Sequence, residues 1–284
     1  MMSQTESMSE SKEQHPVYVL GHDEDELQRL IDQSRHFGDL TEQVLLRAGI
    51  SRGMRVLDLG CGAGDVSFLA ARLVGPAGTV IGVDSAPQAI SMARQRAAQA
   101  KLSNVTFIHS DVADFVPEQQ VDALIGRLVL MYLADPAATL RRLASHVRAG
   151  GVVAFHEMDL TSPPVSLPAS PSYQQIGNWI METFRRGGVE MQMGLKLYRT
   201  FIAAGLPAPQ MSMGASIGGG LESTIYELIA QTVRSLLPMM EALGVATAAE
   251  VEVETLAGRL RREVGSSGAI TAPSLVGAWT RLPR

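Results

Sequence analysis

Cysteine is nearly absent from this chain of 284 residues, and basic residues are fewer than acidic ones. Cys61 is the only cysteine, so no disulfide can form within the chain, which fits a reducing compartment. Lys and Arg total 24 against 29 Asp and Glu, giving a net charge of -5, and no basic run of the kind that grips phosphates occurs. We therefore expect a cytoplasmic protein with no nucleic-acid partner.

Long apolar runs are also missing, although 46% of the residues are hydrophobic, which is ample for a buried core. No uninterrupted apolar run approaches the roughly 20 residues that a membrane-spanning helix needs. The opening MMSQTESMSESKEQH is polar and lacks the apolar centre of a signal peptide. The composition predicts a disordered tail over 1–14, and apolar residues at helical spacing predict an N-terminal helical region within 15–50, for which the family resemblance described below implies the role of a lid.

Short β-branched segments alternate with helical ones through the middle of the chain. This alternation predicts an α/β core over 51–160, followed by cap helices and C-terminal strands over 161–284. The expected strands are 54–60, 79–84, 104–111, 121–130, 150–159, 207–220 and 269–283, and the expected helices are 23–36, 39–49, 64–74, 87–100, 135–147, 172–186, 194–204, 222–242 and 247–264. Such a doubly wound, mostly parallel sheet binds ligands beyond the carboxyl ends of its strands.

A glycine-rich turn, VLDLGCGAGD, follows the first core strand directly. Gly60, Gly62 and Gly64 allow positive φ and close approach of a ligand to the backbone. The helix after the turn offers its N-terminal amides to a negative group. A phosphate-binding loop would need Gly-Lys-Ser/Thr, which does not occur, and the dinucleotide fingerprint fails because Asp65 stands after Gly64 where its third glycine should be.

Acidic residues mark the ends of the first three strands. Asp58 lies at the end of the first strand, Asp84 closes the second, and Asp111 closes the third beside Val112. An acid at the second strand end can accept hydrogen bonds from ribose hydroxyls, and Asp111 with Val112 suits an adenine amino group and ring face. The negative charge of Asp58 would repel a pyrophosphate but would attract an ammonium or sulfonium group. The set suits an adenosine that carries a charged amino-acid tail.

Taken together, VLDLGCGAG, VIGVDSA, HSDVADF and GGVVAF make residues 40–160 resemble the class I S-adenosylmethionine-dependent methyltransferases. The resemblance implies a Rossmann-like, seven-stranded sheet with an antiparallel last strand, S-adenosylmethionine as cofactor and no metal. It assigns the methionine portion to Gly60, Cys61, Gly62 and Gly64 with Asp58 and Arg127 nearby, the ribose to Asp84 and Ser85, and the adenine to Asp111 and Val112.

More loosely, the chain resembles the C-methyltransferases of ubiquinone and menaquinone biosynthesis and their natural-product relatives. Its YVLGHDEDELQRL segment is similar to the N-terminal lid of such enzymes, which implies that Tyr18 and Gln33 close over the cofactor. Cys61 has no evident activating partner, so we interpret it as a packing residue rather than a nucleophile.

The methyl acceptor is indicated less directly than the cofactor. His156 and Tyr198 are the candidates for proton transfer, and the acceptor-binding candidates are Met131, Tyr132, Glu157, Trp179 and Phe184. Aromatic and thioether side chains suit a small, largely apolar acceptor, such as an aromatic, prenylated or terpenoid-indole-like compound. C-methylation, with a possible coupled cyclisation, is slightly favoured over O- or N-methylation with His156 as base.

Two other classes of protein are kept as alternatives. An NAD(P)-dependent oxidoreductase would need the glycine that Asp65 replaces, and no Tyr-x-x-x-Lys pair is found. A non-catalytic S-adenosylmethionine-binding regulator on the same fold is the other. The N-terminal helix and the apolar cap favour a homo-oligomer.

Overall fold

The computed structural model describes residues 24–161 and 163–284, and for residues 24–35 it describes the backbone alone. The predicted tail, Tyr18 and the side chain of Gln33 lie outside the described residues. Within this part of the chain, no helix is both long enough and apolar enough to span a bilayer.

The elements follow the predicted alternation of strands and helices. The helices are α1 (Glu24–Ala48), α2 (Asp65–Val74), α3 (Pro87–Gln99), α4 (Pro136–Ala144), α5 (Pro171–Arg186), α6 (Met193–Ala203), α7 (Ile225–Ala242), α8 (Ala248–Val251) and α9 (Val253–Val264), with a 3-10 helix, η1 (Leu130–Tyr132). The strands are β1 (Arg55–Leu59), β2 (Thr79–Asp84), β3 (Val105–His109), β4 (Val121–Arg127), β5 (Val147–Asp159), β6 (Ser166–Leu167), β7 (Gln210–Gly214), β8 (Ile217–Gly219), β9 (Ala269–Thr271) and β10 (Ser274–Arg281).

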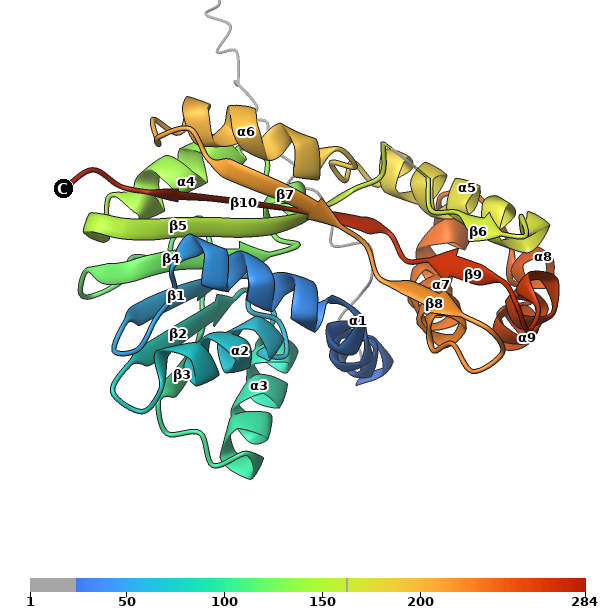
Figure 1. The fold of residues 1–284 in the computed structure, drawn as a ribbon, viewed down its shortest axis with the longest axis horizontal. Coiled ribbons are helices and arrows are strands. Elements are labelled where there is room, and N and C mark those ends of the chain that lie inside the picture. The colour runs from blue at the N-terminus through green and yellow to red at the C-terminus, as the bar shows by residue number, and fades with distance from the viewer. Residues whose placement is uncertain (1–23, 162) are drawn as a thin grey trace, which may run out of the picture.

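A seven-stranded sheet forms the centre of the molecule, in the order β3-β2-β1-β4-β5-β10-β7 (Figure 1). Strands β1 to β5 pair in parallel, whereas β10, the last strand of the chain, runs antiparallel to both β5 and β7. The predicted seven-stranded, mostly parallel sheet with an antiparallel last strand is thus confirmed. Its parallel strands place the ends of β1 to β5 along one edge, where the glycine loop, Asp84 and His156 lie.

Helices cover both faces of this sheet. Helices α1, α2 and α3 contact one face, and α4 and α6 contact the other. Side chains along β5 alternate between the two faces. His156 faces α1, since it approaches Thr41 of that helix, whereas Phe155 faces α6, where its ring packs edge-on against Phe201 with centroids 6.5 Å apart. Glu157 therefore points to the opposite face from His156.

A helical cap lies beside the carboxyl edge of the sheet. It comprises α5, α7, α8 and α9 with a second, three-stranded sheet in the order β6-β9-β8, to the right in Figure 1. The predicted strand 207–220 is in fact two strands, β7 in the central sheet and β8 in the cap. The predicted strand 269–283 divides in the same way into β9 and β10. These two segments join the core to the cap.

Two predicted helix boundaries were wrong. Helix α1 continues where a break between 36 and 39 was expected, because Gly38 has open space around it and nothing interrupts the helix there. The predicted helix 247–264 is divided into α8 and α9 at Glu252, which takes a left-handed conformation with φ 46°.

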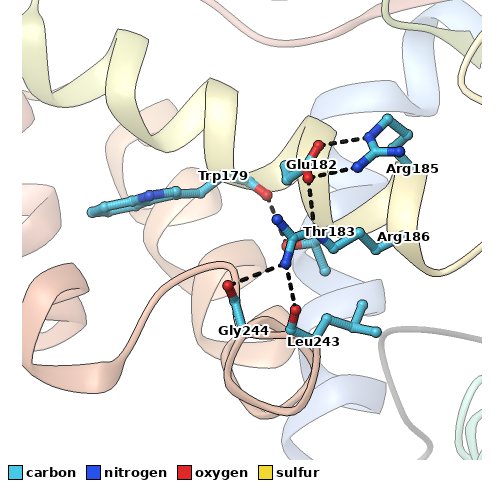
Figure 2. A network of polar contacts seen from close by, with 7 residues as sticks. All are labelled: Trp179, Glu182, Thr183, Arg185, Arg186, Leu243 and Gly244. Carbon is cyan, nitrogen blue, oxygen red and sulfur yellow. Dashed lines mark hydrogen bonds and ion pairs between the residues drawn. The ribbon is translucent and has the colours of Figure 1, made fainter.

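Arg186 holds two cap helices together at their C-terminal ends. Its Nη1 donates to the carbonyls of Leu243 (2.6 Å) and Gly244 (3.2 Å), just beyond α7, while its Nε donates to Glu182 one turn back on α5 (Figure 2). Among the described residues, the side chain of Arg185 pairs with Glu182 only. The cation of Arg186 therefore satisfies carbonyls that the end of α7 leaves without helical partners.

We expect Arg186→Ala to lower the free energy of unfolding by about 1 kcal/mol, since two carbonyls lose a charged donor. The matched variant Arg185→Ala, which breaks only an exposed pair, should leave the free energy of unfolding close to the wild-type value. Urea unfolding of both variants measures the difference. Equal losses would show that the contact with α7 contributes nothing.

Candidate active site

The glycine loop is shaped by left-handed backbone at three positions. Gly60, Gly62 and Gly64 have φ values of 63°, 52° and 92°, and Gly64 is the N-cap of α2. A Cβ on Gly60 would lie 2.5 Å from a γ-methyl of Val129, so the loop after β4 packs directly on this glycine. Both the backbone conformation and the close approach therefore require glycine here.

Asp84 ties the glycine loop to the end of β2. Its half-buried carboxylate accepts hydrogen bonds from the backbone N–H of Gly62 and of Ala86, each at 2.9 Å. The remaining lone pairs of both oxygens can accept hydroxyl groups of a ligand. Ser85 next to it is exposed.

Arg96 of α3 braces the same loop, and nothing in the sequence pattern pointed to it. Its Nη1 donates to the carbonyl of Ala63 at 2.6 Å, and its Nη2 pairs with Asp65 at 2.8 Å. Its guanidinium lies 5.1 Å from the ring centroid of Phe68. The loop is thus held from β2 on one side and from α3 on the other.

Asp58 is fully buried beneath the loop and incompletely satisfied. Its Oδ2 accepts a hydrogen bond from Ser67 Oγ at 2.6 Å, whereas Oδ1 has no partner among the described residues. Burial raises the pKa of Asp58 to about 7, against the lowering effects of the Ser67 hydroxyl and the Arg127 cation. An unpaired buried acceptor is costly, so Oδ1 fits a ligand that donates a hydrogen bond, such as an ammonium group.

The end of β3 presents Asp111 and Val112. Asp111 is exposed, and its Oδ1 accepts the N–H of Ala113 at 2.8 Å, which leaves Oδ2 for a ligand. Val112 is buried, and its carbonyl accepts Arg142 Nη2 at 2.5 Å. The structure therefore brings Asp58, Asp84 and Asp111 to consecutive strand ends around the glycine loop.

Cys61 is buried within this loop. Burial, with the carboxylates of Asp58 and Asp84 nearby, raises the pKa of its thiol well above the usual value. A thiol that resists ionisation is a poor nucleophile, which agrees with the interpretation of Cys61 as a packing residue.

A polar cluster joins α1 to the ends of β4 and β5. The Thr41 hydroxyl donates to the carbonyl of Phe37 (2.9 Å), and its oxygen accepts Arg127 Nη1 (3.2 Å) and lies 3.1 Å from His156 Nδ1. Because the single hydroxyl proton is already used, the contact assigns the proton of neutral His156 to Nδ1. Burial and the adjacent Arg127 lower the pKa of His156 to about 3, so the ring is neutral at physiological pH.

An apolar cavity lies between α1, the end of β5 and the cap helices. None of its lining side chains is charged, and both hydroxyls among them are bonded to the backbone, that of Tyr173 to the carbonyl of Thr271 and that of Thr232 to the carbonyl of Leu228. The lining residues are Phe37, Met158, Leu160, Pro164, Tyr173, Gly177, Ile180, Met181, Leu228, Ile229, Thr232 and Pro273.

The cavity adjoins the polar cluster along two elements. Phe37 lies one helical turn before Thr41 on α1, and Met158 lies two residues after His156 on the same face of β5. The cavity therefore lies next to the ends of β4 and β5, which carry Arg127 and His156.

Tyr198, predicted for proton transfer, and most of the residues predicted to bind the acceptor do not line this cavity. Trp179 and Phe184 are on α5, but neither lines the cavity, which is bordered by their neighbours Ile180 and Met181. Tyr198 has half of its surface exposed on α6 and is not brought to the cavity. Met131 and Tyr132 form η1 after β4, with Met131 buried in the core.

Glu157 is completely buried, on the face of β5 opposite His156. Its Oε1 accepts the backbone N–H groups of Val129 (3.0 Å) and Leu130 (2.9 Å) at the start of η1, and Oε2 has no partner among the described residues. Burial raises the pKa of Glu157 to about 7, although these amides and that of Met131 act to lower it.

The raised pKa of Glu157 predicts that the wild type and Glu157→Gln differ in free energy of unfolding by an amount that depends on pH. From the usual value of 4.5 up to about 7, the folded chain holds a proton on Glu157 that the unfolded chain has released. The free energy of unfolding of the wild type should therefore fall relative to the variant as pH rises through this window, by at most about 3 kcal/mol. Urea unfolding at several pH values measures it, and a constant difference between the two proteins would contradict the raised pKa.

A family model described as a methyltransferase domain matches residues 50–205, which contain the glycine loop, the three acids and the first part of the cap. The chain belongs to this methyltransferase family. The resemblance to the class that depends on S-adenosylmethionine is thereby confirmed.

Curated methyltransferases align with less than half of this chain. The chain is 38% identical over 104 residues to aklanonic acid methyltransferase DauC from Streptomyces sp. (36% of this chain, 47% of that protein). It is 37% identical over 117 residues to arsenite methyltransferase from Halobacterium salinarum (41% and 30%), and 35% over 122 residues to trans-aconitate 2-methyltransferase from Methylobacterium nodulans (43% and 45%). The chain thus spans less than half the length of each of these relatives.

Solved structures support the fold over most of the chain. The YcgJ protein from Bacillus subtilis matches with a TM-score of 0.55 at 15% identity, covering 87% of this chain and 99% of that one. Phosphoethanolamine N-methyltransferase 2 from Haemonchus contortus, solved with S-adenosylhomocysteine, matches with a TM-score of 0.53 at 14% identity, covering 87% and 53%. This methyltransferase therefore has the fold of other methyltransferases.

Proposed function

We propose that this methyltransferase transfers a methyl group from S-adenosylmethionine to a small, largely apolar acceptor held in the cavity between α1, β5 and the cap. The observation that carries the proposal is the position of this uncharged cavity at the end of β5, on the same carboxyl edge of the sheet from which the glycine loop follows β1. The family membership supports the reaction, and the cavity supports the class of acceptor.

The residues around the loop fit S-adenosylmethionine by their chemistry. Asp84 and Ser85 would bind the ribose hydroxyls, Asp111 and Val112 the adenine, and the unpaired Oδ1 of Asp58 the ammonium group. When bound, S-adenosylmethionine supplies a methyl group already activated for displacement. The chain then has to align the acceptor with that methyl group and exclude water.

The cavity supports an acceptor whose bound part is hydrocarbon. A carboxylate or phosphate in it would find no cation among the lining residues, and an amine would find no carboxylate. The hydroxyls of Tyr173 and Thr232 are already bonded to carbonyls. An aromatic, prenylated or terpenoid-indole-like compound of natural-product metabolism satisfies these conditions.

Transfer to carbon remains slightly favoured over transfer to oxygen or nitrogen. O- or N-methylation would use His156 as base, but burial and Arg127 lower the pKa of this ring to about 3, which makes it a weak base. Transfer to an alkene carbon would instead form a cationic centre, which could lead to cyclisation. The cavity suits such an acceptor, because the aromatic rings of Phe37 and Tyr173 among its walls can stabilise a cationic centre.

Mass spectrometry tests the proposal. The purified protein is incubated with S-adenosylmethionine and a panel of apolar aromatic, prenylated and indole compounds, alongside polycarboxylates of similar size. We expect a mass increase equal to one methylene group in members of the apolar set, and fragmentation then locates the methyl group on carbon or on a heteroatom. Methylation confined to the polycarboxylates would overturn the proposed acceptor class.

A further inference from the structure

We propose that Glu157 is a positioning residue for the cofactor site. Its buried carboxylate fixes the loop 128–131, which closes over Gly60, and so sets the affinity for S-adenosylmethionine without touching it. The inference rests on the proposed function, because it concerns the same cofactor. It replaces the expected role of Glu157 in binding the acceptor.

The carboxylate of Glu157 is committed to backbone rather than to ligand. Its Oε1 gathers the N–H groups of Val129 and Leu130 within 3.0 Å, and no salt bridge to Glu157 occurs among the described residues. Its side chain has no exposed surface. Burying a carboxylate without a cation reduces the stability of the fold. We infer that the role of Glu157 is to hold the N–H groups of Val129 and Leu130.

The loop 128–131, which Glu157 holds, contains an energetically unfavourable backbone conformation. Leu128 takes φ 54°, a left-handed conformation that non-glycine residues rarely adopt, and its N–H donates to the carbonyl of His156 at 3.0 Å. Such a conformation persists where its surroundings enforce it. The N–H groups of Leu128, Val129 and Leu130 all donate to acceptors on β5, and these hydrogen bonds hold the loop in this conformation.

Val129 transmits this restraint to the glycine loop. Its γ-methyl lies 2.5 Å from the position that a Cβ on Gly60 would take, so Val129 packs directly against this glycine. Gly60 in turn precedes Gly62, whose N–H is held by Asp84. If Val129 shifts, Gly60 loses a packing contact that restrains its left-handed backbone. We expect the glycine loop 60–64 beside Asp84 to become more mobile as a result.

Calorimetric titration with S-adenosylmethionine tests this chain of contacts. Glu157→Ala should weaken binding by roughly 10-fold or more, as displacements of about 1 Å in a preorganised site do. Glu157→Gln should bind within about threefold of wild type, because its amide oxygen accepts the same N–H groups. Hydrogen exchange at the amides of Val129 and Leu130 should be faster in Glu157→Ala and unchanged in Glu157→Gln.

Asp159 provides a matched control from the same strand. It is also a buried carboxylate without a salt bridge among the described residues, but its Oδ2 accepts the N–H of Leu195 at 2.8 Å in the first turn of α6, away from the glycine loop. Asp159→Ala should lower the melting temperature and leave the affinity for S-adenosylmethionine unchanged. A merely structural role for Glu157 would make the two alanine variants behave alike.

Several outcomes would overturn the inference. They are wild-type affinity in Glu157→Ala, an equal loss in Glu157→Gln, or an equal loss in Asp159→Ala. Should Glu157→Ala fail to fold, Val129→Ala tests the same contact, since it removes the γ-methyls from Gly60. Wild-type affinity in Val129→Ala would then decide against the inference. Failure of the wild type to bind S-adenosylmethionine would instead count against the proposed function.

Discussion

Replacement of Asp84 by alanine should weaken S-adenosylmethionine binding by about 100-fold or more. Two effects combine in this variant. Under the proposed assignment, the ribose hydroxyls lose a charged acceptor. In addition, the N–H groups of Gly62 and Ala86 lose the carboxylate that holds them at 2.9 Å. Calorimetric titration of the variant against the wild type measures the loss.

Asp122 supplies the control for this experiment. It is likewise a partly buried aspartate at a strand terminus, and it accepts the N–H of Arg55 at 2.6 Å and pairs with Arg148, but it lies at the beginning of β4. Asp122→Ala should therefore reduce stability without changing the affinity for S-adenosylmethionine. Unchanged affinity in Asp84→Ala would mean that the assigned cofactor site is wrong.

The substitution Gly177→Phe should remove most of the methyltransferase activity and leave the affinity for S-adenosylmethionine nearly unchanged. Gly177 is on α5 and lines the cavity, and apart from its chain neighbours and the adjacent helix backbone no described atom lies within 4 Å of the position that a Cβ would occupy. The ring of Gly177→Phe would therefore occupy space intended for the acceptor. We expect kcat/KM to fall by about 100-fold, with the affinity for S-adenosylmethionine within about threefold of wild type.

Gly177→Ala is the matched control, because a single methyl group leaves most of the cavity open. It should retain nearly full activity, and it should be more stable by up to about 1 kcal/mol, since alanine is the better helix former. Steady-state kinetics with an acceptor found by mass spectrometry compares the two variants. Full activity in Gly177→Phe would show that the acceptor binds elsewhere.

The cofactor side of the site could be predicted because its determinants are local. The strand, the glycine turn and the following helix occupy consecutive residues, and parallel pairing brings Asp58, Asp84 and Asp111 to one edge of the sheet. Helix α1 was divided wrongly because Gly38 looks like a break in sequence, whereas in the structure its backbone continues the helix without obstruction.

The acceptor side could not be predicted in the same way. The cavity is assembled from separate segments, represented by Phe37, Met158, Gly177, Ile229 and Pro273, and no sequence spacing relates them. Residue type alone predicts the aromatic residues of the cap as acceptor contacts, but which side of a helix faces a cavity depends on the elements packed against it. The cavity is consequently bordered by Ile180 and Met181, next to the predicted Trp179.

The most direct test of this account is a calorimetric titration of the wild-type protein with S-adenosylmethionine, with its demethylated product, and with NAD. The geometry of the glycine loop, Asp58 and Asp84 predicts saturable binding of both sulfur compounds at one site per chain and no binding of NAD. Binding of NAD without either sulfur compound would contradict the account.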